Sequence, residues 1–206
     1  MQDSDYSSAK KISSLNELYR RLDITTSIRY NSAVRLSFHH KFSQWVVTLV
    51  SVSLIVIPLF QAMEVPLKSN PQSLDAVEVL LAVIVLVYSL LLGNENYSNR
   101  SEKMQACGLE LGRLSRKIYP YLDQPHNLKI YESFLHLYHN VLDKYPNHDQ
   151  IDYKIYRIKH RKKYYTSRRM HILDCFKVRF ESAIGYWHYT IIMIGVIVTL
   201  LFIFRF

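Results

Sequence analysis

The fold is decided by the run WVVTLVSVSLIVIPLF, Trp45–Phe60, which contains no charged residue. Extended to Phe42–Met63, the run is about 20 residues long, enough for a helix that rises about 1.5 Å per residue to cross a roughly 30 Å hydrocarbon layer. Two further runs resemble it: Ala76–Leu92, with Glu78 as its one acid, and Tyr189–Phe204. The sequence therefore predicts three membrane-spanning helices.

The alternative is that these runs are buried core helices of a globular protein. The rest of the chain is too short to cover three helices that are apolar all round, which favours the membrane. Aromatic rings flank two of the runs, as expected at the headgroup region: Phe42, Trp45, Tyr186 and Trp187. No cleaved signal peptide is expected, because about forty mostly polar residues precede the first run.

The 26 Lys and Arg residues are spread unevenly along the chain. Seven precede the first run, Lys68 alone lies in 61–75, seventeen lie in 94–183, and Arg205 is near the end. Because cytoplasmic segments carry the excess of positive charge, we expect the N-terminus and 94–183 inside, and the 61–75 loop and the C-terminus outside. The expected topology is thus multi-pass, with both the N-terminus and the large charged segment in the cytoplasm.

Cys107 and Cys175 would both lie on the cytoplasmic side. Thiols in that compartment are usually reduced, so we expect no structural disulfide.

The predicted fold class is all-α: an integral membrane protein with three transmembrane helices and a cytoplasmic helical bundle. Four parts are expected. They are a cytoplasmic N-terminal amphipathic helix (1–44), a two-span hairpin (45–93), a cytoplasmic helical domain with a basic helix (94–183) and a C-terminal span (184–206).

Helical periodicity continues outside the spans. No Pro or Gly lies between Met1 and Pro58, so one long helix is expected to enter the first span. Pro120 should end the next cytoplasmic helix, and a further helix should continue to Pro146. Asn147 is expected to cap a long helix that leads into the third span. A packing seam of threes and fours precedes Pro120: Met104, Gly108, Leu111, Ser115 and Ile118.

The sequence offers little evidence for catalysis. His136 and His139 lie one helical turn apart, and His148 with Asp149 follows, but closed zinc sites usually contain cysteine or a tighter second pair. A histidine-rich surface is the simpler interpretation. With five glycines and no glycine-rich phosphate loop, the chain is expected to be no enzyme and to need no cofactor or metal.

A basic cluster interleaved with tyrosines is the clearest electrostatic feature. Such a pattern suits phosphate contacts with base stacking, so a nucleotide or nucleic acid ligand is one hypothesis. Pairing with anionic membrane lipid, or a solvated face, is the other. Charge alone does not separate them. The cluster consists of Lys154, Arg157, Lys159, Arg161, Lys162, Lys163, Arg168 and Arg169.

The spans contain few polar residues. Small and hydroxyl-bearing side chains commonly mark helix contacts in lipid, which is the simpler interpretation. Alternatively, one face of the first span lines a pore in a homo-oligomer, and Glu78 forms a ring at its mouth that favours cations. The candidate pore-lining residues are Thr48, Ser51, Ser53 and Glu78.

Three stretches around the spans are similar to the SLATT proteins, the SMODS and SLOG-associating two-transmembrane effectors. The short motifs inside them, Arg29 to Asn31, Asn99 with Arg100, and His148 to Tyr153, are specific only together. The third span departs from the simple two-span pattern. The stretches are RLDITTSIRYNSAVRL (21–36), YSNRSEKMQACGLELGRLSRKI (97–118) and YPNHDQIDYKIY (145–156).

The resemblance implies a bacterial antiviral-defence effector, located as a multi-pass protein in the inner membrane, that causes abortive infection by opening or disrupting that membrane. It implies a co-encoded partner, either a nucleotide-second-messenger synthase or a reverse transcriptase. Four residues flanking the first two spans are candidates for coupling the spans to the cytoplasmic helices: Arg29, Asn31, Asn99 and Arg100. The alternative function is a non-conducting membrane anchor that recruits and restrains such an enzyme.

Overall fold

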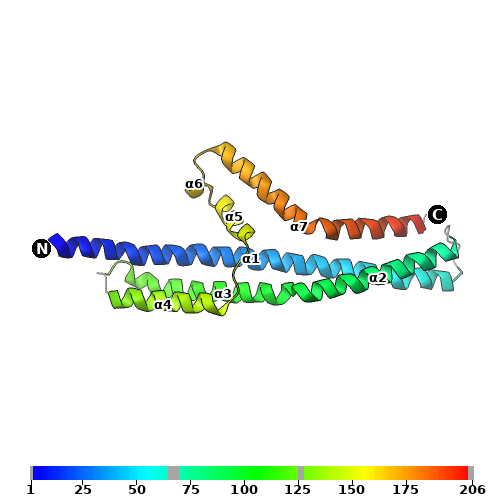
Figure 1. Ribbon diagram of the computed structural model, residues 1–206, viewed down its shortest axis with the longest axis horizontal. Helices are drawn as coiled ribbons and strands as arrows, with labels where there is room; N and C mark the ends of the chain where they lie inside the picture. Colours follow the sequence, from blue (N-terminus) through cyan, green and yellow to red (C-terminus); the bar gives the residue numbers. More distant parts are fainter. Residues whose placement is uncertain (1, 65–69, 125–127, 204–206) are drawn as a thin grey trace. The chain divides into compact units, whose positions relative to one another are not determined.

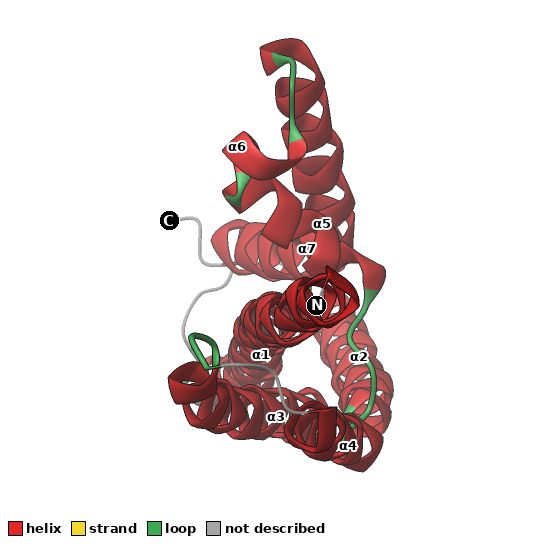
Figure 2. Ribbon diagram, turned by 90° about the vertical axis from the view of Figure 1, so that its left-hand side faces the viewer, coloured by secondary structure: helices red, strands yellow, loops and turns green. Residues whose placement is uncertain are grey.

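The computed structural model describes the backbone of residues 2–64, 70–124 and 128–203, and their side chains except those of 2–13, Pro71 and Phe202. Within these residues the chain forms helices and no strand, and 91% of the protein is helical (Figures 1 and 2). The predicted all-α class is confirmed.

The helices follow one another with short connections. In chain order they are α1 (Gln2–Ala62), α2 (Pro71–Glu95), α3 (Tyr97–Ile118), the short 3-10 helix η1 (Tyr119–Tyr121), α4 (Leu128–Lys144), α5 (Gln150–Lys159), α6 (Arg161–Tyr164) and α7 (Arg168–Ile203).

Among the described residues, three helices are long and apolar enough to cross a membrane: α1, α2 and α7. They contain the three predicted runs except Phe204, which lies outside the described residues. α1 is one continuous helix through Pro58, as expected from the absence of Pro and Gly before that residue. Asn70 caps α2 by accepting a hydrogen bond from the Gln72 backbone N–H, and Asn96 closes it in the left-handed conformation.

The described chain divides into two compact units, which we treat separately. The body unit comprises 1–36 and 99–178, and the span unit comprises 37–98 and 179–206. The core of the span unit is made by apolar side chains of α1, α2 and α7: Val46, Val50, Ile57, Leu74, Leu81, Tyr189, Val196 and Ile203.

The core of the body unit lies between α1 and the α3–α4 hairpin. Leu15, Leu18 and Leu22 of α1 pack with α3, and aromatic side chains of α4 cover them. The predicted α3 seam is confirmed at Met104, Gly108, Leu111 and Ile118, whereas Ser115 is only half-buried and Cys107 and Leu114 are buried too.

A close approach of α1 and α3 explains Gly108. A Cβ atom at this position would lie 3.2 Å from the Tyr30 ring, which is tighter than ordinary van der Waals contact. Nearby, burial raises the pKa of the Cys107 thiol, so this cysteine is held in its neutral form inside the core.

The expected single helix from Asn147 into the third span is wrong. Asp149 occupies the N-cap position of α5, and the Asn147 side chain instead accepts from the His148 backbone N–H. The helix breaks at His160, whose backbone leaves the helical region, and again before α7, where Ser167 offers a typical helix-start residue.

Candidate functional site

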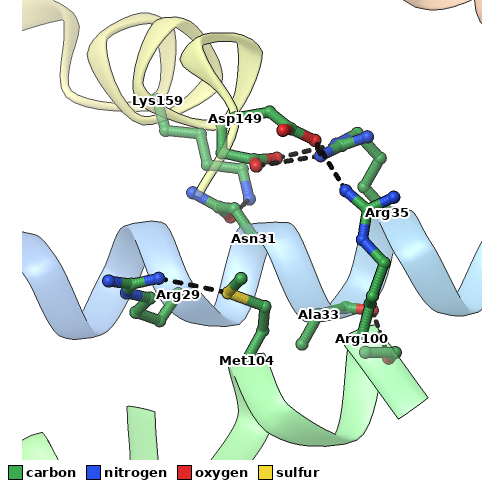
Figure 3. Close-up of polar contacts among 10 residues, drawn as sticks. Arg29, Asn31, Ala33, Arg35, Arg100, Met104, Asp149 and Lys159 are labelled. Carbon is green, nitrogen blue, oxygen red and sulfur yellow. Dashed lines mark hydrogen bonds and ion pairs between the residues drawn. The ribbon is translucent and has the colours of Figure 1, made fainter. Parts of the chain in front are cut away.

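Side chains from three separate segments meet around residues 29–35 of α1 (Figure 3). The segments are α1 itself, the first turns of α3, and the stretch from Pro146 through α5. We call this set the charged node. Its members are Arg29, Asn31, Arg35, Arg100, Met104, Asn147, His148, Asp149, Asp152 and Lys159.

Arg35 is the centre of the node. Its Nε donates to Asp152 Oδ1 at 2.8 Å and its second guanidinium nitrogen donates to Oδ2 at 3.0 Å, a two-pronged pair, while a further ion pair joins Arg35 to Asp149. Asp152 is fully buried. Burial opposes the charge on Arg35, but the hydrogen bonds that Arg35 donates to Asp152 and Asp149 outweigh it and raise the pKa of the guanidinium. The pair therefore holds α5 on α1.

Arg29 is more deeply buried than Arg35, and fewer of its N–H groups have good hydrogen-bond acceptors. Its guanidinium donates to the Pro146 carbonyl and to Asn147 Oδ1 at 3.5 Å, and lies 3.3 Å from the Met104 sulfur. Its Nε has no hydrogen-bond partner, and no carboxylate among the described residues pairs with it. The Arg29 charge is thus met by neutral acceptors, one of them a weak thioether.

Three further contacts join the segments of the node. Lys159 Nζ donates to Asn31 Oδ1 at 2.6 Å, Ser101 Oγ donates to the Ala33 carbonyl at 2.8 Å, and Arg100 lies 3.7 Å from Asp149. Of the four predicted coupling residues, Arg29, Asn31 and Arg100 therefore join α1, α3 and α5, as Figure 3 shows for the labelled side chains. The fourth, Asn99, is exposed on α3 outside the node.

His148 lies near Arg29, the arginine of the node that has no carboxylate partner among the described residues. Its Nδ1 is buried without a hydrogen-bond partner. Burial lowers the pKa of His148, and the neighbouring positive charge of Arg29 lowers it further, although Asp152 and Asp149 act in the opposite direction. The environment thus favours a neutral imidazole.

A basic pocket opens at the other end of α5. Its volume is about 710 Å³. Arg161, Lys162 and Lys163 of the one-turn helix α6 are exposed. The pocket is lined by Lys159, His160, Arg161, Lys162, Lys163 and Tyr165, so it offers cations beside the rings of His160 and Tyr165.

The eight-residue cluster predicted from the sequence is thereby divided. Lys159, Arg161, Lys162 and Lys163 line the basic pocket, whereas Arg157 pairs with Asp174 at 3.9 Å and lies over the Tyr165 ring.

The remaining three cations lie outside that pocket. Lys154 is half-buried on α5, and Arg168 with Arg169 is exposed in the first turn of α7.

The candidate pore residues occupy different environments in the span unit. Thr48 lines a groove of about 450 Å³ between α1 and α2, together with Gln44 and Ser89. Ser51 and Glu78 are half-buried. Ser53 is buried and donates to the Leu49 carbonyl at 2.9 Å, a placement that matches the helix-contact interpretation for this residue.

Two of the histidines considered for a metal site, His136 and His148, have different neighbours. His136 bonds to Asn140 on α4, and His148 belongs to the charged node. Among the described residues, no three His, Cys, Asp or Glu side chains are grouped closely enough to hold a metal ion.

Comparison with curated proteins and with solved structures finds no match. A family model does match, over residues 11–202, and it covers the charged node, the basic pocket and most of all three spans. The model is that of the SMODS and SLOG-associating 2TM effector domain family 5. Because the match extends almost to the end of α7, most of the third span lies within the matched domain. The chain belongs to this SLATT family of membrane effector domains associated with SMODS and SLOG proteins.

Proposed function

We propose that the chain is a bacterial antiviral-defence effector that forms an oligomeric pore in, or disrupts, the inner membrane when a nucleotide or nucleic acid signal occupies the basic pocket. Family membership supports the coarser part, a membrane effector of defence systems associated with nucleotide-signalling partners. The signal would come from a co-encoded synthase or reverse transcriptase, and its outcome would be abortive infection.

The observation that carries the proposal is the position of the basic pocket at one end of α5 while the charged node holds the other end. Lys159 belongs to both, since it lines the pocket and donates to Asn31 of α1. A phosphate in the pocket would compete with Asn31 for the Lys159 ammonium. Ligand binding would thus favour an arrangement in which α5 is held less firmly on α1, by as much as its affinity for the two arrangements differs.

The spans would respond because α1 contains both the node residues and the first span in one helix. Polar side chains of the span unit offer a path for water where they are not already hydrogen-bonded and buried inside the unit, as Ser53 is. Thr48 and Ser89, which line the α1–α2 groove, are the favoured pair.

The pore is tested by recording membrane potential in cells that express the chain with an activated partner. Depolarisation should precede growth arrest. Arrest at an unchanged potential would reject the pore.

The ligand site is tested by charge reversal at two exposed cations, Lys162→Glu with Lys163→Glu. Activation should be lost while the protein stays in the membrane, because the cations of α6 face the pocket rather than the core. The matched control is Arg116→Glu with Lys117→Glu on α3, two exposed cations outside the pocket. If the two double variants lose activation equally, the α6 cations act through the net positive charge of the protein, for example by pairing with anionic lipid, and not through a ligand in the pocket.

One observation favours the alternative of a non-conducting anchor: the Ser53 hydroxyl is already used within the span unit. The variant Thr48→Leu with Ser51→Leu separates the two functions. Toxicity should fall if these residues line a path, whereas full toxicity with stable co-purification of the partner enzyme would support the anchor.

A further inference from the structure

α7 has two apolar faces within the span unit, and only one of them is used there. Tyr189, Val196 and Ile203, spaced seven residues apart, are buried against α1 and α2. The opposite face is exposed, with each of its large apolar side chains between 53% and 66% accessible. We call it the α7 seam: Phe180, Ile184, Trp187, Ile191, Ile194, Val198 and Leu201.

The seam has the spacing of a coiled coil. Its members alternate at intervals of four and three residues, the repeat that keeps one stripe of a helix facing a partner helix when both supercoil. The same register extends upstream in the sequence through Lys177 to Leu173 and Met170, with Lys177 as its one polar position. Both apolar residues upstream are exposed.

Lipid tails do not account for the whole seam. Phe180 of the seam lies between Arg179 and Glu181, and Leu173, upstream in the same register, precedes Lys177, so both apolar side chains belong to a charged stretch outside the hydrocarbon layer. Leu173 is 69% exposed. Large apolar side chains exposed in such a charged stretch usually mark a surface that another protein covers.

We propose that the α7 seam packs against α7 of a second copy of this chain as a parallel coiled coil. Two copies inserted in one membrane in the same orientation place equal residues at equal depth, so the seam meets itself in register. The alternate positions Ile184, Ile191 and Val198 are β-branched, which is typical of one core position in parallel coiled coils. Because the seam lies opposite the buried face, pairing would leave the span-unit core unchanged.

This inference rests on the homo-oligomer in the proposed function and names the surface that forms it. It is tested first by disulfide cross-linking of the full chain in membranes, in a Cys107→Ala, Cys175→Ala background. Single cysteines at Ile184, Trp187 and Ile191 should yield covalent dimers, and those at Ala183 and Thr190, exposed positions to one side of the seam, several-fold fewer. Equal yields at the two sets would overturn the seam.

A matched pair of neighbouring residues gives the second test. Leu173 lies in the seam register, whereas Ile172 is also exposed but faces away from it. Leu173→Ser should weaken self-association about tenfold, as expected for losing a buried leucine, measured by energy transfer between labelled copies in liposomes. Ile172→Ser should leave it unchanged, and equal effects would contradict the proposal.

Both tests measure association without the activating signal. A seam that cross-links while the membrane potential stays intact on activation would refute the pore and keep the α7 pairing. Depolarisation with no cross-linking preference for the seam would refute the pairing alone.

Discussion

Two arginines of α1, the half-buried Arg35 and the buried Arg29, have their charges compensated in different ways. Arg35 is held by a fully buried carboxylate, Asp152, with Asp149 beside it. Arg29 is only 3% exposed, yet it is met by a carbonyl, an amide oxygen and a sulfur. Since a buried charge without a counter-charge keeps most of its desolvation cost, the node is firm at Arg35 and weakly satisfied at Arg29.

The largest effect is expected from removing the buried carboxylate. Asp152→Ala should lower the free energy of unfolding by about 3 kcal/mol, because it leaves Arg35 desolvated with one remaining carboxylate. The measurement is denaturant unfolding in detergent micelles. Asp149→Ala is the control: this side chain is 48% exposed, and its loss should cost about 1 kcal/mol or less. Equal losses of stability in the two variants would show that Asp149 and Asp152 contribute equally to holding Arg35.

A smaller effect on the free energy of unfolding is expected at Arg29, the arginine without a carboxylate partner. Arg29→Met keeps much of the side-chain packing and removes a buried charge that has no carboxylate, so the free energy of unfolding should change by about 1 kcal/mol or less. Arg35→Met should cost about 3 kcal/mol in the same assay. If the two substitutions cost the same, Arg29 has an effective counter-charge and the contrast between them fails.

The smallest effect is a dependence on pH through His148. Its pKa is lowered in the folded protein, so below about pH 6.5, the usual histidine value, the unfolded chain takes up the proton more readily. Stability is therefore complete above that pH and falls as the pH drops through it toward the lower folded value. Thermal unfolding at pH 7.5 and pH 5.5 should show a smaller difference for His148→Gln than for the unaltered chain.

The matched control for this measurement is His139→Gln, a substitution at an exposed position of α4. It should leave the pH difference unchanged. An unchanged difference in His148→Gln would assign the pH dependence to other groups and remove His148 from the weak side of the node.

The spans and the long first helix were predictable from the sequence because their signals are local. A charge-free run of spanning length and the absence of Pro and Gly each act within one segment. The break at His160 has no such signal, since no Gly or Pro is near it. The break between α6 and α7 did have a local signal, because Thr166 and Ser167 precede α7 and are residues that favour a helix start.

The charged node was predicted in part. Resemblance to the family pointed to Arg29, Asn31 and Arg100, but Arg35 and Asp152 were missed. Their pairing joins residues more than a hundred positions apart, which no local pattern encodes. A usable hint was the pair of acids Asp149 and Asp152 on one face of the first turn of a helix. The basic cluster is visible in the sequence as a run of charges and its ligand role stays a prediction, but its division between the basic pocket and internal contacts depends on where the helix breaks.

Pro58 gives the first span a hinge. A proline has no N–H for the carbonyl of Leu54, and its ring pushes against that turn of α1. In hydrocarbon, no water replaces the missing donor. The turn between these two residues is therefore the place where the span bends at least cost, so its last residues, up to Ala62, can swing while the apolar core around Val46 and Val50 stays packed.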